Sequence, residues 1–194
     1  MNTGIIASRY ASALLKLVDE TGGGETVVSQ VEILSNALDA MPDLRRAIGD
    51  SKSVSAESKV SLFEAVLGEM PNTVMAPELR KFIELLIRNG RIADCRLVFN
   101  SFVPMYYKSR GIVRGRLILP FPADSSASAR DLEASLKDMI ASKTGKKLLL
   151  KTEVDDSLIG GFVLEVEDQL LDASVSHQLE IIKRQFIERN RRIV

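Results

Sequence analysis

The sequence contains no tryptophan, one cysteine and one histidine among its 194 residues. A single cysteine, Cys95, excludes an intramolecular disulfide and a metal site built from several thiolates, and it fits a reducing compartment. No apolar run approaches the roughly 20 residues that a membrane-spanning helix needs. The N-terminal stretch also lacks the charged region and apolar block of a signal peptide. We therefore expect a soluble protein whose association with any membrane is indirect.

An excess of either charge is also missing, because 26 Lys and Arg residues balance 26 Asp and Glu residues. Proteins that bind nucleic acids usually carry a basic excess, since their affinity comes largely from contacts with phosphates. The balance therefore argues against nucleic acid as the partner. A short basic strip at Arg189, Arg191 and Arg192 keeps a helical RNA-binding module open as an alternative.

The first half of the chain has the apolar spacing of helices. Aromatic residues make up only 5% of the sequence, and hydrophobic residues make up 45%. Hydrophobic side chains recur every three or four residues, and Gly, Ser and Pro mark the breaks between the periodic segments. Pro104 is expected to kink or end the last of these helices. The pattern predicts helices over residues 3–20, from 25 to about 40, 43–48, from Ser53 or Ser55 to about 68, 78–89 and from 92 onward.

The pattern changes after Gly111, where strand-like alternation begins at Ile112. We predict strands over 112–119 and 147–154 with a helix over 125–142 between them. A hairpin with strands 161–167 and 170–174 follows, with its turn at Asp168 and Gln169, and then a helix over 175–191. The predicted fold is mainly α with a smaller α+β part. A six-helix bundle over residues 1–108 precedes a strand-helix-strand-hairpin-helix domain over 109–194.

No arrangement of reactive residues points to catalysis. His177 lacks a nearby cysteine and is expected to be solvated, and Cys95 lies on an apolar helix stripe as a small hydrophobic residue would. Several acidic residues follow the later strands, and a cation bound there would make the protein a small metal-dependent enzyme. Solvated acids are the simpler interpretation of Asp155, Asp156, Glu165, Glu167 and Asp168. We expect no catalytic residue, no cofactor and no metal.

Helix faces are the remaining candidates for function. Small residues on the first helix would let another helix approach closely, and the fifth helix carries an apolar stripe. Together they are candidates for a groove that holds a partner helix, although the same residues could instead pack against each other inside the bundle. The candidate groove residues are Ala7, Tyr10, Ala11, Leu14, Leu79, Phe82, Ile83 and Leu86.

The run from Asp156 to Val175, followed by Leu179 on an amphipathic helix, resembles the C-terminal signature of the delta subunit of F-type ATP synthases. The mitochondrial members of this family are the oligomycin-sensitivity-conferring proteins. Two further stretches agree, residues 10–14 (Tyr-Ala-Ser-Ala-Leu) and residues 82–91, which end in Asn-Gly-Arg. This chain departs from the family at Glu167 and Ala173, where glycine is usual.

The resemblance implies a non-catalytic peripheral-stalk subunit that links the catalytic head to the membrane-anchored stalk and resists torque. Its helical bundle would bind the N-terminal segments of the alpha subunits through the candidate groove. Its C-terminal domain would bind the b-type stalk subunits, for which the candidate contacts are Val175, Leu179, Ile182 and Phe186. The resemblance also implies a location on the cytoplasmic face of the bacterial inner membrane, as a peripheral part of the proton-transporting complex.

Overall fold

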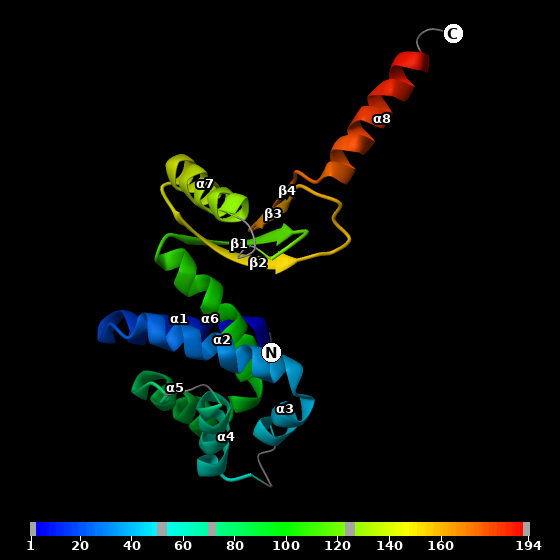
Figure 1. Cartoon of the computed structure of the whole chain (residues 1–194). Coiled ribbons are helices and arrows are strands. Elements are labelled where there is room, and N and C mark those ends of the chain that lie inside the picture. The colour runs from blue at the N-terminus through cyan, green and yellow to red at the C-terminus, as the bar shows by residue number, and fades with distance from the viewer. Residues whose placement is uncertain (1–2, 50–53, 70–72, 123–126, 192–194) are drawn as a thin grey trace. The chain divides into compact units, whose positions relative to one another are not determined.

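The computed structural model describes residues 3–49, 54–69, 73–122 and 127–191. The protein is mainly helical and has a small four-stranded sheet. The chain forms two compact units, and the boundary between them lies between Tyr106 and Tyr107. Unit 1 contains the first helices, which Figure 1 colours from blue to green: α1 (Thr3–Thr21), α2 (Gly24–Ala40), α3 (Pro42–Gly49), α4 (Ala56–Gly68), α5 (Pro77–Arg88), the 3₁₀ turn η1 (Ile92–Asp94) and α6 (Cys95–Ser109), whose last turn enters unit 2.

The helix boundaries of unit 1 follow the local signals in the sequence. Gly22, directly after α1, has a φ of +78°, which glycine adopts without strain at the end of a helix. The hydroxyl of Ser55 accepts a hydrogen bond of 3.1 Å from the Ser58 N–H and caps α4. Pro77 is the first residue of α5, where its missing N–H costs nothing. Of the two predicted caps of α4, Ser53 lies outside the described residues.

The core of unit 1 consists of large apolar side chains supplied by several helices. Phe63 of α4 and Phe99 of α6 meet edge to face with their ring centroids 6.3 Å apart. A partly buried hydrogen bond of 2.6 Å joins the side chains of Ser35 and Asn100 between α2 and α6. The side chains that are fully buried include Phe63, Phe99, Phe102, Leu14, Leu34, Leu38, Ile48, Leu67, Leu79, Ile83 and Leu86.

Pro104 does not end the sixth helix, so of the two predicted outcomes only a kink remains compatible with the structure. The helix α6 continues from Cys95 to Ser109 with Pro104 inside it. Pro104 lies on the exposed side of α6. The Asn100 carbonyl that loses its helical partner can therefore bond to water, and the helix tolerates the proline.

Unit 2 is a small sheet with a helix on one face. Its strands are ordered β2-β1-β3-β4. The strands β1 and β2 pair in parallel, whereas β3 pairs antiparallel with both β1 and β4. The parallel pair requires a crossover, and α7 supplies it. The elements are β1 (Ile112–Leu119), α7 (Ala127–Thr144), β2 (Lys147–Val154), β3 (Val163–Val166), β4 (Gln169–Asp172) and α8 (Val175–Arg191).

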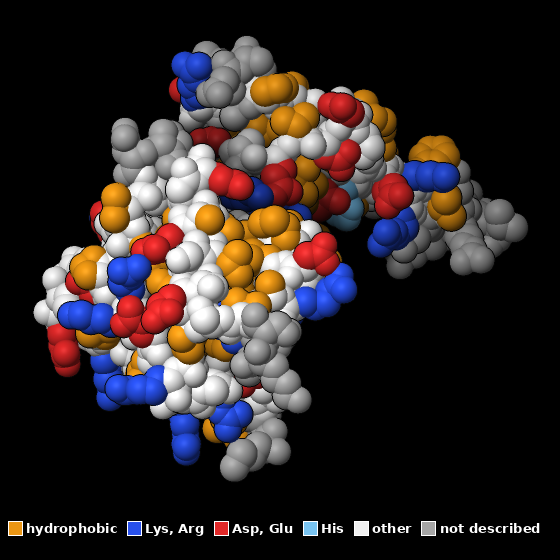
Figure 2. Space-filling view, turned by 90° about the horizontal axis from the view of Figure 1, so that it is seen from below, with side chains coloured by type: hydrophobic (Ala, Val, Ile, Leu, Met, Phe, Trp, Pro, Cys, Tyr) orange, Lys and Arg blue, Asp and Glu red, His pale blue; other side chains and the backbone are white. Residues whose placement is uncertain are grey.

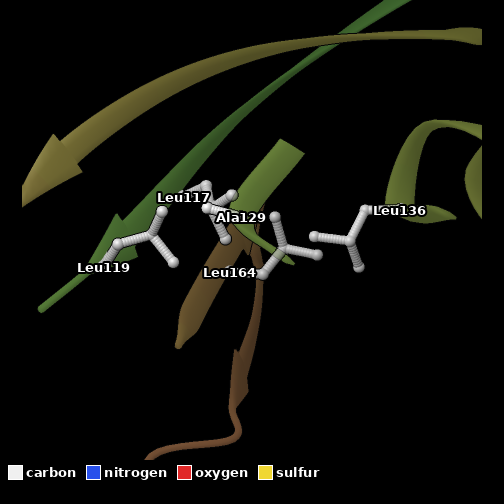
Figure 3. Packing of buried hydrophobic residues seen from close by; sticks show 5 residues of the cluster. All are labelled: Leu117, Leu119, Ala129, Leu136 and Leu164. Atoms are coloured by element: carbon white, nitrogen blue, oxygen red, sulfur yellow. The ribbon is translucent and has the colours of Figure 1, made fainter. Parts of the chain in front are cut away.

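Alternate residues of the strands face α7 and form a second core. Figure 3 shows the side chains of this cluster converging between α7 and the sheet: Leu117, Leu119, Ala129, Leu136 and Leu164. Leu132, Phe162 and Val166 pack against its edge. On the same face of the sheet, the Thr152 hydroxyl donates a hydrogen bond of 2.6 Å to Glu133 of α7.

The other face of the sheet carries charged side chains. Arg116 of β1 pairs with Glu165 of β3 and lies 3.4 Å from Glu153 of β2. These bonds raise the pKa of Arg116, chiefly through the hydrogen bond to Glu165. The pKa of Glu153 is lowered, first by its hydrogen bond to Lys151. These opposite charges connect three neighbouring strands across the exposed face.

The hairpin is shorter than the sequence predicted. Its turn is formed by Glu167 and Asp168, because Gln169 already belongs to β4. The strand β4 ends at Asp172, so Ser174 is free to cap α8. The helix predicted from residue 125 is described from Ala127 onward, and Ser125 lies outside the described residues.

Candidate partner-binding surfaces

The candidate groove on α1 and α5 is mostly filled by its own side chains. All of its residues except Tyr10 are buried: Ala7, Ala11, Leu14, Leu79, Phe82, Ile83 and Leu86. These residues form part of the core of unit 1, as the alternative interpretation of their periodicity allowed. Only Tyr10 reaches the surface at the seam between the two helices.

Tyr10 is held in place from two sides. Its ring meets Phe82 edge to face at 6.4 Å between centroids. The Asn89 side-chain amide donates a hydrogen bond of 3.2 Å to the phenol oxygen. Because the phenol oxygen accepts this bond, the Tyr10 O–H hydrogen can point toward another acceptor. Tyr10 thus presents a fixed donor at the α1–α5 seam.

A surface pocket of about 440 Å³ lies beside Tyr10. We call it the α1 pocket. Its lining combines apolar surface with two guanidinium groups, and consists of Ile6, Arg9, Tyr10, Ala13 and Arg91. Sequence reasoning did not select Arg9 or Arg91, because exposed arginines leave no periodic signal. Arg91 belongs to the Asn-Gly-Arg stretch that carries the family resemblance, but that stretch alone assigned it no contact.

The side chains of α8 form a second candidate surface. Val175, Leu179, Ile182 and Phe186 are between 36% and 67% exposed, although all four are apolar. Their spacing of four, three and four residues aligns them in one narrow stripe, as in the seam of a coiled coil. We call this stripe the α8 seam. Figure 2 shows hydrophobic side chains next to Lys and Arg side chains on this helix.

The first turn of α8 is attached to the sheet by a compact junction. Gly161 has a φ of +80°, and the Ala173 N–H donates a hydrogen bond of 2.9 Å to the Phe162 carbonyl. The Val175 N–H donates one of 3.0 Å to the Gly160 carbonyl. These bonds hold the beginning of the α8 seam against the start of β3.

A polar cap completes this junction. The Ser174 hydroxyl accepts a hydrogen bond of 3.2 Å from the His177 N–H, and the Asp172 carboxylate accepts one of 2.9 Å from the Ser174 N–H. Hydrogen bonds from the Ser174 hydroxyl and N–H lower the pKa of Asp172. The Asp172 carboxylate also lies 3.9 Å from the His177 ring. The cap thus uses the backbone N–H of His177, while the His177 ring lies beside the Asp172 carboxylate.

The other reactive candidates have structural surroundings. Cys95 is buried, and burial raises the pKa of its thiol to about 12. A thiol with such a pKa is not a nucleophile near neutral pH. Asp155 accepts a hydrogen bond of 2.9 Å from the Ser157 N–H, and the bonds from Ser157 lower its pKa.

Within the described ranges, no group of three or more His, Cys, Asp and Glu side chains is arranged to hold a metal ion. No described helix has both the length and the apolar character needed to cross a membrane.

Comparison with known proteins covers both units. Residues 6–186 match the family described as ATP synthase delta (OSCP) subunit. A protein of Phocaeicola vulgatus named ATP synthase subunit delta is 33% identical over 194 residues, which span all of both chains. The protein of that name from Bacteroides thetaiotaomicron is 30% identical over 194 residues, again all of both chains. The one from Solidesulfovibrio magneticus is 33% identical over 187 residues, 95% of this chain and 97% of the relative.

Proposed function

We propose, from the premise that this chain belongs to the ATP synthase delta (OSCP) subunit family, that it links the catalytic head of the enzyme to the peripheral stalk. Members of this family are structural subunits of ATP synthase and are not catalytic themselves. Membership in it replaces the alternatives of a metal-dependent enzyme and an RNA-binding module. The subunit is a peripheral part of the complex. Its position on the cytoplasmic face of the bacterial inner membrane belongs to the proposal.

The α8 seam is the observation that best supports a linking role. Four apolar side chains aligned on an exposed helix leave water-exposed surface that a second helix would cover. The narrow stripe fits a single partner helix. Apolar side chains at this spacing form the contact line between two helices of a coiled coil. We propose that the b-type stalk subunits supply this helix.

A pair of matched substitutions on α8 tests the stalk contact. Ile182→Ser removes an apolar side chain from the α8 seam, whereas Arg184→Ser removes a long side chain from the opposite face. Burial of an isoleucine side chain is worth about 1.5–3 kcal/mol, so Ile182→Ser should weaken binding roughly tenfold or more. Arg184→Ser should change it by less than about threefold. Binding of the full-length chain to the water-soluble part of the b-type subunit is the measurement, and equal effects of the two substitutions would contradict the contact.

The head contact is proposed for the surface of the α1–α5 seam around Tyr10. The buried residues of the candidate groove cannot test it, because a charge at Ala11 would lie in the core and unfold unit 1. Ala13 is exposed and lines the α1 pocket, whereas Ser8 is exposed on α1 outside it. Ala13→Glu should therefore weaken binding of an alpha-subunit N-terminal peptide, and Ser8→Glu should leave it unchanged. Unaltered binding of Ala13→Glu would move the contact elsewhere.

Each of the two proposed contacts belongs to a different domain of the chain. Residues 1–108 would form a six-helix bundle that binds the alpha subunits, and residues 109–194 would bind the stalk. A chain that ends before Leu179 should keep its affinity for the head and lose the stalk. Retention of the stalk by this shortened chain would contradict the assignment.

A further inference from the structure

We infer that the α1 pocket selects a partner helix by binding an acidic side chain between Arg9 and Arg91, next to the apolar stripe of that helix. This inference rests on the proposed contact with the alpha-subunit N-terminal segment. It adds the chemistry by which that segment would be recognised.

The polar groups of the α1 pocket are all hydrogen-bond donors. Arg9 and Arg91 bring guanidinium groups, and the Tyr10 phenol keeps its hydrogen available while its oxygen accepts the bond from Asn89. None of these three side chains presents a free acceptor to the others. A ligand that completes the pocket must therefore supply acceptors, and a carboxylate supplies two oxygens that suit a guanidinium.

The positive charges of the α1 pocket are only weakly compensated by the chain's own carboxylates. Arg91 lies 3.8 Å from Asp94, which is a long and weak ion pair. In the part of the chain that the structure describes, no carboxylate forms an ion pair with Arg9. The α1 pocket thus keeps at least one uncompensated positive charge, which an anionic group of the partner would neutralise.

The apolar part of the α1 pocket favours a helix over a small free anion as its ligand. Ile6 and Ala13 line the same pocket, and Ile5 is 56% exposed on the same helix. If a phosphate ion bound the two arginines, these neighbouring apolar side chains would stay exposed to water. An amphipathic helix covers them with its apolar stripe while a flanking Asp or Glu reaches the guanidinium groups.

The test uses the full-length chain and a peptide of the alpha-subunit N-terminal segment. Arg9→Gln and Arg91→Gln should each raise the Kd about fivefold or more, because each removes a charge-assisted hydrogen bond. Arg45→Gln on α3 makes the same change on an exposed side chain outside the α1 pocket and should have no effect. Thermal unfolding of each variant separates a loss of contact from a loss of fold.

Substitutions in the peptide complete the test. One Asp or Glu, replaced by its amide, should reproduce the loss in the wild-type chain and add nothing in Arg9→Gln. With Lys at that peptide position, binding should be restored by Arg9→Glu. Peptide affinity within about twofold of wild type in both Arg9→Gln and Arg91→Gln would overturn the inference while leaving the head contact intact. Displacement of the peptide by inorganic phosphate, with no effect of the peptide amides, would also overturn it. A wild-type chain that binds no peptide would overturn both proposals.

Discussion

The ring of Tyr106 occupies the space that a side chain at Gly24 would need. A Cβ atom at residue 24 would lie 2.6 Å from the Tyr106 phenol oxygen and 2.8 Å from a ring carbon. Tyr106 is buried, and Gly24 is the first residue of α2. The contact therefore joins the beginning of α2 to α6, and the glycine is required here by close approach rather than by its backbone angle.

Gly24→Ala should destabilise unit 1 by about 1–3 kcal/mol, because the rigid Tyr106 ring must move out of a packed site. Gly68→Ala is the matched control, since a Cβ at Gly68 in α4 meets nothing within 4 Å. This control should be neutral or stabilising by up to about 1 kcal/mol through helix propensity. Urea unfolding followed by circular dichroism measures both. Equal stability of the two variants would show that Tyr106 can move aside.

Gly161→Ala should break the junction between the hairpin and α8. The added Cβ would lie 2.3 Å from the Ala173 carbonyl oxygen, and the residue also has a φ of +80°. Gly145 has a φ of +67° with nothing within 4 Å, so Gly145→Ala isolates the backbone strain of about 1–2 kcal/mol. Hydrogen exchange of the Ala173 and Val175 amides should accelerate in Gly161→Ala alone. Normal protection of both amides would refute the clash.

Glu167→Gly should stabilise the hairpin. Glu167 has a φ of +51° and is the only non-glycine residue with a positive φ among the described residues. Relief of this strain is offset in part by the greater freedom of glycine in the unfolded chain, so the gain is up to about 1 kcal/mol. Asp168→Gly at the next turn position relieves no such strain and should destabilise. The midpoint of urea unfolding compares them, and a loss of stability in Glu167→Gly would contradict the explanation.

The cap of α8 should weaken in acid through Asp172. The folded-state pKa of this carboxyl group is lowered by its bonds to Ser174, so its ionised form stabilises the fold. That contribution is present above the unfolded pKa, near pH 4, and is lost as the pH falls through the lower folded value. The protection factor of the His177 amide, which is its intrinsic exchange rate divided by the observed rate at the same pH, should fall below about pH 4 in the wild-type chain. In Asp172→Asn the exchange should be faster already at neutral pH, with little further change caused by this group.

Local signals in the sequence predicted most elements and the β3–β4 hairpin, but not how the remaining strands pair. Gly22 and Ser55 set helix ends through bonds within a few residues, which a sequence pattern can reveal. The parallel partner of Ile112 is Lys147, and the order of the four strands depends on such distant contacts. The sequence left open whether Pro104 kinks or ends its helix, because the rule for proline does not say which side of the helix faces water.

The candidate surfaces show a related limit. An apolar stripe has the same spacing whether its own chain covers it, as at Leu79, or leaves it exposed, as at Leu179. Periodicity therefore proposed two similar contacts, of which one is core and the other is surface. The α1 pocket was missed because Arg9 and Arg91 come together only when α1 lies beside the end of α5.

The junction at the root of α8 has a mechanical consequence. A pull on α8 would be passed through Ser174 to the end of β4, which is a four-residue strand at the edge of the sheet. The first bonds under load would be those from Val175 to Gly160 and from Ala173 to Phe162. Beyond them, the hydrogen-bonded route from β4 to the central strand β1 passes through β3. The β3–β4 hairpin therefore sets the largest tension that unit 2 can transmit through α8.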